Sequence, residues 1–241
     1  MNNVQAVIMA GGKGQRLRPF TTVFPKPLMP IGDVPMLDLV VRQLRHFGFT
    51  EITVTVGYLA ELVLAYLGDG AQYGVKIHFV REREPLGTIG PLASIENDGE
   101  SVLVINGDVL TTIDYADLVR SHRESGAAAT VATYRRPYTV DKGIVTVDAQ
   151  NRVGSFLEKP TYHHLVVMGV YVIEPHVLRL MTPGARMDAP ELMQKLLDSG
   201  QHVHSYGFDG YWLDIGKPDD YDKATADFDS LRSALLHEDK K

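Results

Sequence analysis

The first 135 residues alternate short apolar runs with amphipathic stretches. Four of the apolar runs have the length and composition of buried strands: Val4–Met9, Ile52–Val56, Val75–Val80 and Ser101–Ile105. Two stretches between them, Met36–Phe47 and Glu61–Leu67, read as helices that end at a glycine, and a third helix, Asp114–Ser125, follows the last run. This alternation predicts an α/β fold, with a mainly parallel, Rossmann-like sheet covered by helices.

From Gly143 onward the pattern changes, because strands follow one another with little helix between them. Ile144–Val147, Val153–Phe156 and Val166–Ile173 predict a small antiparallel-containing lobe over the sheet. We therefore expect a single domain over residues 1–241, with a first part at about 1–135 and a second at about 136–241. Pro190 marks the start of a later helix, and we expect no C-terminal β-helix.

The composition restricts the classes of function. The chain has 241 residues, 44% of them hydrophobic, which is enough for a full core. It has no cysteine, which excludes disulfides, thiolate catalysis and cysteine-bound zinc. Its net charge of −6 argues against duplex nucleic acid as a partner. No apolar run is long enough to cross a bilayer and no secretory signal is evident, so we expect a cytoplasmic protein without a membrane partner.

One segment departs from this acidic balance. Between Met1 and Gly32 there is no Asp or Glu, yet Lys13, Arg16, Arg18 and Lys26 are all found there. The segment follows the first predicted strand and contains three glycines, Gly11, Gly12 and Gly14, which allow a sharp turn and a close approach to a ligand. A strand that leads into a cationic, glycine-rich turn is typical of phosphate binding in α/β folds.

Two better-known phosphate loops do not match. A Walker loop ends in Gly-Lys-Ser/Thr, whereas Gly14 is followed by Gln15 and Arg16. A dinucleotide fingerprint requires Gly or Ala where Leu17 stands. The glycines alone are equally compatible with a surface loop that carries incidental charge.

Further along the chain, several short motifs are ambiguous when each is taken alone. Gly87 and Thr88 could belong to a capped turn or to a ligand contact, and we expect Glu82 nearby to be a solvated loop charge. Asp108 ends a buried strand at the sheet edge where ligands bind, but it becomes a metal candidate only if a second carboxylate reaches it. An exposed pair such as Glu158 and Lys159 is ordinarily solvated.

Taken together, these motifs resemble the sugar-1-phosphate nucleotidyltransferases, also called nucleotide-sugar pyrophosphorylases. The resemblance begins with the pattern from Gly11 through Arg16 to Pro25-Lys26-Pro27-Leu28. Six further motifs follow in the family's order: Glu84-Pro-Leu-Gly-Thr88, Asn106-Gly-Asp108, Gly143-Ile-Val, Glu158-Lys-Pro160, Gly169-Val-Tyr171 and Trp212-Leu-Asp-Ile-Gly216. Such an ordered set is far more specific than any one of its members.

The resemblance implies roles for individual residues. The catalytic set would be Arg16, Lys26, Asp108 and Asp214. The nucleotide-binding set would be Ala10, Gly11, Gly12, Gly14, Arg16, Lys26, Gly87, Thr88 and Asp108. The sugar phosphate would be bound by Gly143, Glu158, Lys159 and Gly169. The cofactor would be Mg²⁺, held by the carboxylates of Asp108 and Asp214.

The implied reaction joins a nucleoside triphosphate and a sugar 1-phosphate into a nucleotide sugar and pyrophosphate. The motif around Gly87 looks most like the mannose-1-phosphate or heptose-1-phosphate guanylyltransferases, which favours GTP. Thymidylyl and cytidylyl transfer to glucose 1-phosphate or a related sugar stays open, and so does a homo-oligomer. Two other classes are a non-catalytic regulatory domain of the same fold and a glycosyltransferase that uses a nucleotide sugar.

Overall fold

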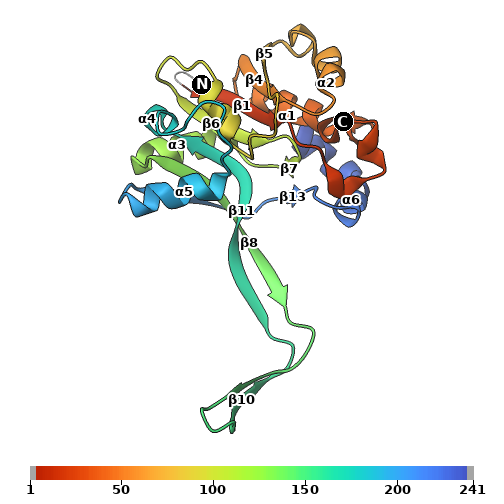
Figure 1. The fold of residues 1–241 in the computed structure, drawn as a ribbon. Coiled ribbons are helices and arrows are strands. Elements are labelled where there is room, and N and C mark those ends of the chain that lie inside the picture. The colour runs from red at the N-terminus through yellow and green to blue at the C-terminus, as the bar shows by residue number, and fades with distance from the viewer. Residues whose placement is uncertain (1–3, 238–241) are drawn as a thin grey trace.

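A seven-stranded sheet organises the protein, whose computed structural model describes residues 4–237 (Figure 1). In chain order its strands are β1 (Val4–Ala10), β4 (Glu51–Val56), β5 (Lys76–Arg81), β6 (Ser101–Asn106), β8 (Ala129–Thr139), β11 (Thr161–Ile173) and β12 (Val203–Phe208). Across the sheet their order is β12-β8-β11-β6-β1-β4-β5. The pairs β6–β1, β1–β4, β4–β5 and β8–β12 are parallel. The predicted mainly parallel sheet is therefore confirmed.

Strand β11 is the exception, because it pairs antiparallel with both of its neighbours, β6 and β8. This arrangement makes β8 run in the same direction as β1 and β6. The carboxyl ends of these three strands therefore meet at one edge of the sheet, where open α/β sheets bind their ligands. Strand β11 enters the sheet from the same edge.

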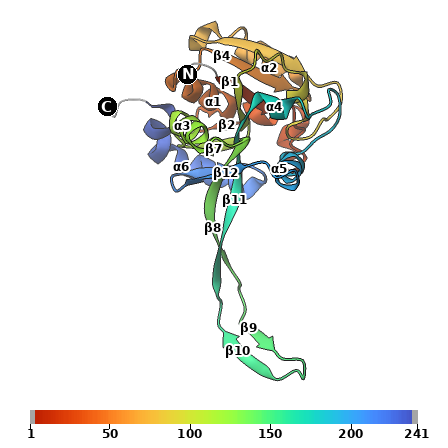
Figure 2. The same ribbon diagram turned by 90° about the vertical axis from the view of Figure 1, so that its left-hand side faces the viewer.

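Helices cover both faces of the sheet (Figures 1 and 2). The six α-helices of the described chain are α1 (Met36–His46), α2 (Ala60–Leu67), α3 (Tyr115–Ser125), α4 (Pro175–Leu178), α5 (Ala189–Asp198) and α6 (Pro218–Leu236). Successive residues of a strand point to opposite faces, so Ile8 packs with the core under α1, α2 and α3, whereas Val7 packs with α4 and α5. A third cluster forms beneath α6, around Phe228.

Local sequence signals explain the helix boundaries. Asp114 caps α3 by accepting the backbone N–H groups of Ala116 and Asp117 at 2.8 and 2.9 Å, and Gly126 ends the helix in a left-handed conformation. At α5, Asp188 and Glu191 form a reciprocal capping box. These signals lie within a few residues of the helix that they cap, so they can be identified from the sequence.

The antiparallel part of the protein is a long arm, which we define as residues 135–167. Strands β8 and β11 continue as a pair beyond the sheet, and β9 (Ile144–Val147) and β10 (Val153–Leu157) form a second hairpin at the tip. Figures 1 and 2 show the arm projecting away from the body. The antiparallel strands were thus predicted correctly, but they do not lie over the sheet as expected.

Two small sheets complete the fold. Strand β7 (Val109–Thr111) pairs antiparallel with β13 (Trp212–Asp214), and β2 (Pro30–Ile31) pairs with β3 (Val34–Pro35). The predicted division near residue 135 falls inside β8, and residues 1–3 and 238–241 of the predicted domain lie outside the described chain. None of the helices in the described chain combines the length and apolar character that a membrane span requires.

Candidate active site

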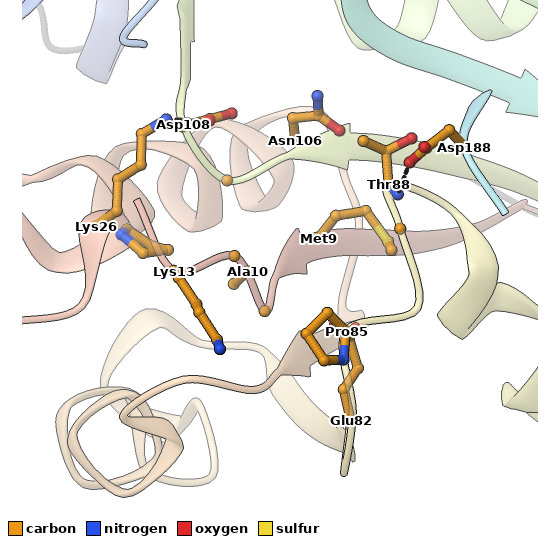
Figure 3. A pocket seen from close by; sticks show the side chains of 15 residues that line it. Met9, Ala10, Lys13, Lys26, Glu82, Pro85, Thr88, Asn106, Asp108 and Asp188 are labelled. Carbon is orange, nitrogen blue, oxygen red and sulfur yellow. Dashed lines mark hydrogen bonds and ion pairs between the residues drawn. The ribbon is translucent and has the colours of Figure 1, made fainter. Parts of the chain in front are cut away.

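A pocket of about 270 Å³ opens at the carboxyl ends of β1 and β6 (Figure 3). Its lining comes from segments that are far apart in the sequence: Met9–Lys13, Lys26–Pro27, Glu82, Pro85, Gly87–Thr88, Asn106–Asp108 and Asp188. Figure 3 shows Lys26 and Asp108 at one end of the pocket and Thr88 with Asp188 at the other. The sheet edge thus brings the predicted nucleotide-binding segments together.

The glycine-rich loop forms one wall because its backbone can pass close to other groups. A Cβ atom added to Gly11 would lie 1.9 Å from a carboxylate oxygen of Glu82, so no other residue fits there without movement. Gly14 has a positive φ of 58° and its carbonyl accepts the hydroxyl of Thr21 at 2.8 Å. Unlike Gly11 and Gly12, Gly14 does not line the pocket but packs against the side chain of Lys26.

Lys26 is buried and forms an ion pair with Asp108. It begins a short 3₁₀ helix, Lys26–Leu28, and Pro27 within it and Pro30 after it keep the loop from continuing as an α-helix. Asp108 follows strand β6, in the turn that leads into β7. A cation and an anion are therefore held together where β1 and β6 end.

Asp214 joins this pair through the small β7–β13 sheet. It lies opposite Val109 in the ladder, and the backbone N–H of Ile215 donates to the carbonyl of Asp108 at 3.1 Å. Burial and the charge of Asp108 raise the pKa of Asp214, while Lys26 and Arg16 act in the opposite direction. Asp214 is therefore electrostatically coupled to the Lys26–Asp108 pair.

Arg16 is found beside the same acids. It belongs to a short 3₁₀ helix, Gln15–Leu17, and is exposed. A Cβ atom added to Gly216, two residues after Asp214, would lie 3.1 Å from a guanidinium nitrogen of Arg16. The structure therefore brings Arg16, Lys26, Asp108 and Asp214 into one neighbourhood.

The other end of the pocket is built on the start of helix α5. The backbone N–H of Thr88 donates to the carboxylate of Asp188 at 2.9 Å, and the hydroxyl of Thr88 accepts the N–H of Ala189 at 2.8 Å. Gly87 has a φ of 83°, and a Cβ atom there would lie 2.5 Å from the carbonyl of Met187. These contacts hold the Gly87–Thr88 turn against α5.

Two acids of the pocket were not recognised from the sequence. Glu82 was expected to be a solvated loop charge, but it is half-buried, accepts the N–H of Leu86 at 3.2 Å, and burial raises its pKa. Asp188 carried only the signal of a helix cap, and nothing near it indicated a pocket. Asn106 lines the pocket as well, within a motif from which we had selected Asp108. These three residues belong to the pocket because segments far apart in the sequence fold next to one another, which a local pattern does not reveal.

The predicted sugar-phosphate residues divide into two groups. Gly169 lies beside the pocket, because a Cβ atom there would come within 2.7 Å of the amide nitrogen of Asn106. Gly143, Glu158 and Lys159 lie on the arm, where a Cβ atom on Gly143 would meet the Glu158 carboxylate at 2.9 Å. The structure brings these three together with one another but not with the pocket.

Comparison with known proteins agrees with this geometry. A family model described as Nucleotidyl transferase matches residues 5–230. A UTP–glucose-1-phosphate uridylyltransferase from Synechocystis sp. is 34% identical over 98% of this chain and 65% of its own length. A mannose-1-phosphate guanylyltransferase from Mycobacterium tuberculosis is 33% identical over 94% of this chain and 65% of its own length. The chain thus spans a little less than two thirds of these curated relatives.

Solved structures show the same fold over nearly the whole chain. HddC from Yersinia pseudotuberculosis, in complex with GMP-PN, is 26% identical and superposes with a TM-score of 0.70 over 93% of this chain and 99% of that one. A structure from Bacillus anthracis, 24% identical, has a TM-score of 0.75 over 92% of this chain and 94% of that one.

Proposed function

Because the chain belongs to the nucleotidyl transferase family, we propose that it transfers a nucleotidyl group from a nucleoside triphosphate to a sugar 1-phosphate. The observation that carries this proposal is the cluster of Lys26, Asp108 and Asp214 at one end of a pocket whose wall is a glycine-rich backbone. The curated relatives named above act, by their names, on sugar 1-phosphates.

In the proposed reaction, an oxygen of the sugar 1-phosphate attacks the α-phosphorus of the triphosphate. The bond from that phosphorus to its β-bridging oxygen breaks, and pyrophosphate leaves. No general base is required, since the attacking phosphate oxygen is already ionised at neutral pH. The task of the protein is therefore to align two anions and to neutralise their charge.

The residues of the pocket suit this task. Lys26 would contact the phosphate undergoing transfer, and Arg16 would bind the departing pyrophosphate with its planar set of donors. Backbone N–H groups of Gly11 and Gly12 would meet the triphosphate along the loop. The Gly87–Thr88 turn at the far end would lie against the base, because it is fixed by Asp188 away from the charged cluster.

A magnesium ion fits the two carboxylates at this end. Asp108 and Asp214 offer hard oxygen donors, and burial together with the nearby charge of Asp108 raises the pKa of Asp214, which a bound cation would offset. Among residues 4–237 no group of three or more acidic or histidine side chains is arranged to hold a metal, so substrate phosphates and water would complete the coordination. When bound, Mg²⁺ neutralises developing charge on the phosphates.

For the substrates we propose GTP and a mannose or heptose 1-phosphate, in the cytoplasm. The relatives from Schizosaccharomyces pombe and Mycobacterium tuberculosis that match this chain are named for guanylyl transfer to mannose 1-phosphate, and the HddC structure holds a guanine nucleotide analogue. The Synechocystis relative is named for uridylyl transfer, so the base has to be tested directly.

The test is a panel of nucleoside triphosphates against several sugar 1-phosphates, read by pyrophosphate release and by chromatography of the nucleotide sugar. We expect pyrophosphate to appear only when both substrates and Mg²⁺ are present, and most rapidly with GTP. Release of a nucleoside diphosphate from a nucleotide sugar would indicate a glycosyltransferase instead. Absence of turnover with every pair would favour a regulatory domain.

A further inference from the structure

The arm exposes more large apolar side chains than is usual for a hairpin surrounded by water. Nine of the sixteen large apolar residues exposed within the described chain lie on it. Four of them share one face of the tip hairpin, because Val145 lies opposite Phe156 and Val147 lies opposite Val153. Their exposed fractions are 50, 65, 55 and 64% in that order. A lone two-stranded hairpin is at best marginally stable in water, so this face requires a cover.

The opposite side of the tip has a different character. Thr146 and Ser155 lie opposite each other there and share a hydrogen bond of 2.7 Å between their hydroxyl groups. Ile144 and Leu157 also lie opposite each other on this side, nearer the body, and Leu157 is 50% exposed, so the polar character is confined to the outer part of the tip around Thr146 and Ser155. The cover is therefore expected mainly on the side of Val145 and Phe156.

The body of the same chain cannot cover the apolar face of the tip while β8 and β11 stay paired. The ladder of β8 and β11 runs without interruption from Val167 to Thr161, and the N–H of Val140 extends it by donating to the carbonyl of Pro160 at 3.0 Å. At about 3.3 Å per residue, Lys159 lies roughly 26 Å along the arm from Val167. Figures 1 and 2 show that this direction leads away from the body.

A matching apolar surface lies beside the pocket. Phe20, Val23 and Phe24 are 59, 75 and 41% exposed, and they occupy the loop between Arg16 and the pocket-lining Lys26. The arm leaves from the same edge of the sheet at which the pocket opens. One chain therefore carries both an apolar tip and, beside the pocket, an apolar surface that its own tip cannot reach while the arm stays extended.

We propose that two copies of this chain form a symmetric dimer in which the arm of each lies over the pocket of the other. The apolar face of the tip packs on the Phe20–Phe24 loop of the second copy, and two-fold symmetry buries both tips and both loops at once. The arm also brings Glu158 and Lys159 to the partner's pocket. This last step rests on the proposed function, whereas the dimer itself does not.

The dimer is tested first without reference to activity. By light scattering we expect twice the chain mass of 26.7 kDa for the wild type. Phe156→Ser should shift the protein to monomer, while Thr146→Ser on the polar face should leave it dimeric, both with an unchanged circular dichroism spectrum. A monomeric wild type would overturn the proposal.

The absence of cysteine from the chain permits a direct test of the contact. A Val23→Cys chain mixed with a Val147→Cys chain should give a covalent dimer with a bismaleimide, and a chain that carries both changes should also cross-link between copies. Replacing Val147→Cys by Thr146→Cys, on the polar face, is the matched control and should cross-link much less. A cross-link within one chain would instead show that the arm folds back on its own body.

Complementation tests whether the arm acts in the partner's site. Asp108→Asn disables the body and Lys159→Ala disables the arm, so each variant alone should be nearly inactive. In a mixture that exchanges subunits, a mixed dimer pairs one intact body with one intact arm, and about a quarter of all sites should recover. Recovery no greater than the sum of the single variants, with an active wild type, would overturn this step. An inactive wild type that still dimerises would instead overturn the proposed function.

Discussion

The backbone N–H of Ile215 donates to the carbonyl oxygen of Asp108 at 3.1 Å, which joins two segments that are far apart in the sequence. This bond belongs to the β7–β13 sheet, which places the Asp214 carboxylate within the electrostatic influence of Asp108. The sheet is small, but it brings together the two acids that we propose to hold one cation.

If the carboxylates of Asp108 and Asp214 share one metal ion, the decreases in kcat caused by replacing each of them should not multiply in the double variant. We expect Asp108→Asn and Asp214→Asn each to lower kcat by orders of magnitude, with the double variant little worse than either single one. Turnover is measured over a range of Mg²⁺ concentrations, and thermal melts confirm that the fold persists. Multiplicative losses would argue for two independent roles.

The close approach of Gly11 to Glu82 predicts a specific steric effect. Gly11→Ala places a methyl group against the Glu82 carboxylate, which has to turn away from the N–H of Leu86, and should destabilise the protein by about 0.5–1.5 kcal/mol. Gly12→Ala is the matched control, because a Cβ atom there meets nothing within 4 Å. Stability is measured by urea unfolding, and adding Glu82→Ala should restore most of the loss in the Gly11 variant. If the second change restores nothing, the strain lies elsewhere.

Asp188 should affect nucleotide binding beyond its role as a helix cap. Asp188→Ala removes the acceptor of the Thr88 N–H as well as the cap of α5, so we expect a raised KM for the nucleotide together with a stability loss of about 1 kcal/mol. Asp114→Ala removes only the cap of α3 and should lower stability by a similar amount with an unchanged KM. Equal effects of both variants on KM would contradict a positioning role for Asp188.

A buried network around His122 predicts a pH-dependent contribution to stability. Burial alone would raise the pKa of Glu174, but hydrogen bonds from His122 and Ser101, both 2.8 Å long, hold that pKa below its usual value of 4.5. A carboxyl group whose pKa is lowered by folding stabilises the protein above its unfolded pKa, and this contribution is lost as the pH falls through the lowered folded value.

We therefore expect Glu174→Gln to lower Tm at pH 7, and the gap to the wild type to narrow below pH 4.5. Melting curves at several pH values measure the gap, and the exposed Glu124→Gln serves as a control with little effect at any pH. A gap that stays constant with pH would show that the loss comes from packing rather than from charge.

The Asp108 neighbourhood illustrates how much of the site is encoded locally. The order of motifs from Gly11 to Gly216 identified the family, and Arg16, Lys26, Asp108 and Asp214 do come together. Strand ends and glycine turns are short-range features, so a periodic pattern is enough to predict them. Glu82 belongs to no such pattern, and the only local pattern that includes Asp188 is a helix cap, so the place of both residues in the pocket was missed.

By itself, the sequence determined the parallel sheet, the helix boundaries and the charged end of the pocket, because propensity, spacing and capping act over a few residues. Only the tertiary structure decided that Glu82 is half-buried against Gly11 and that Asp188 reaches Thr88. It also decided that Glu158 and Lys159 lie on an arm and not over their own pocket. Alternation along a strand predicts which face a residue occupies, but where a paired ribbon leads depends on the partner strand and on contacts that the local pattern does not contain.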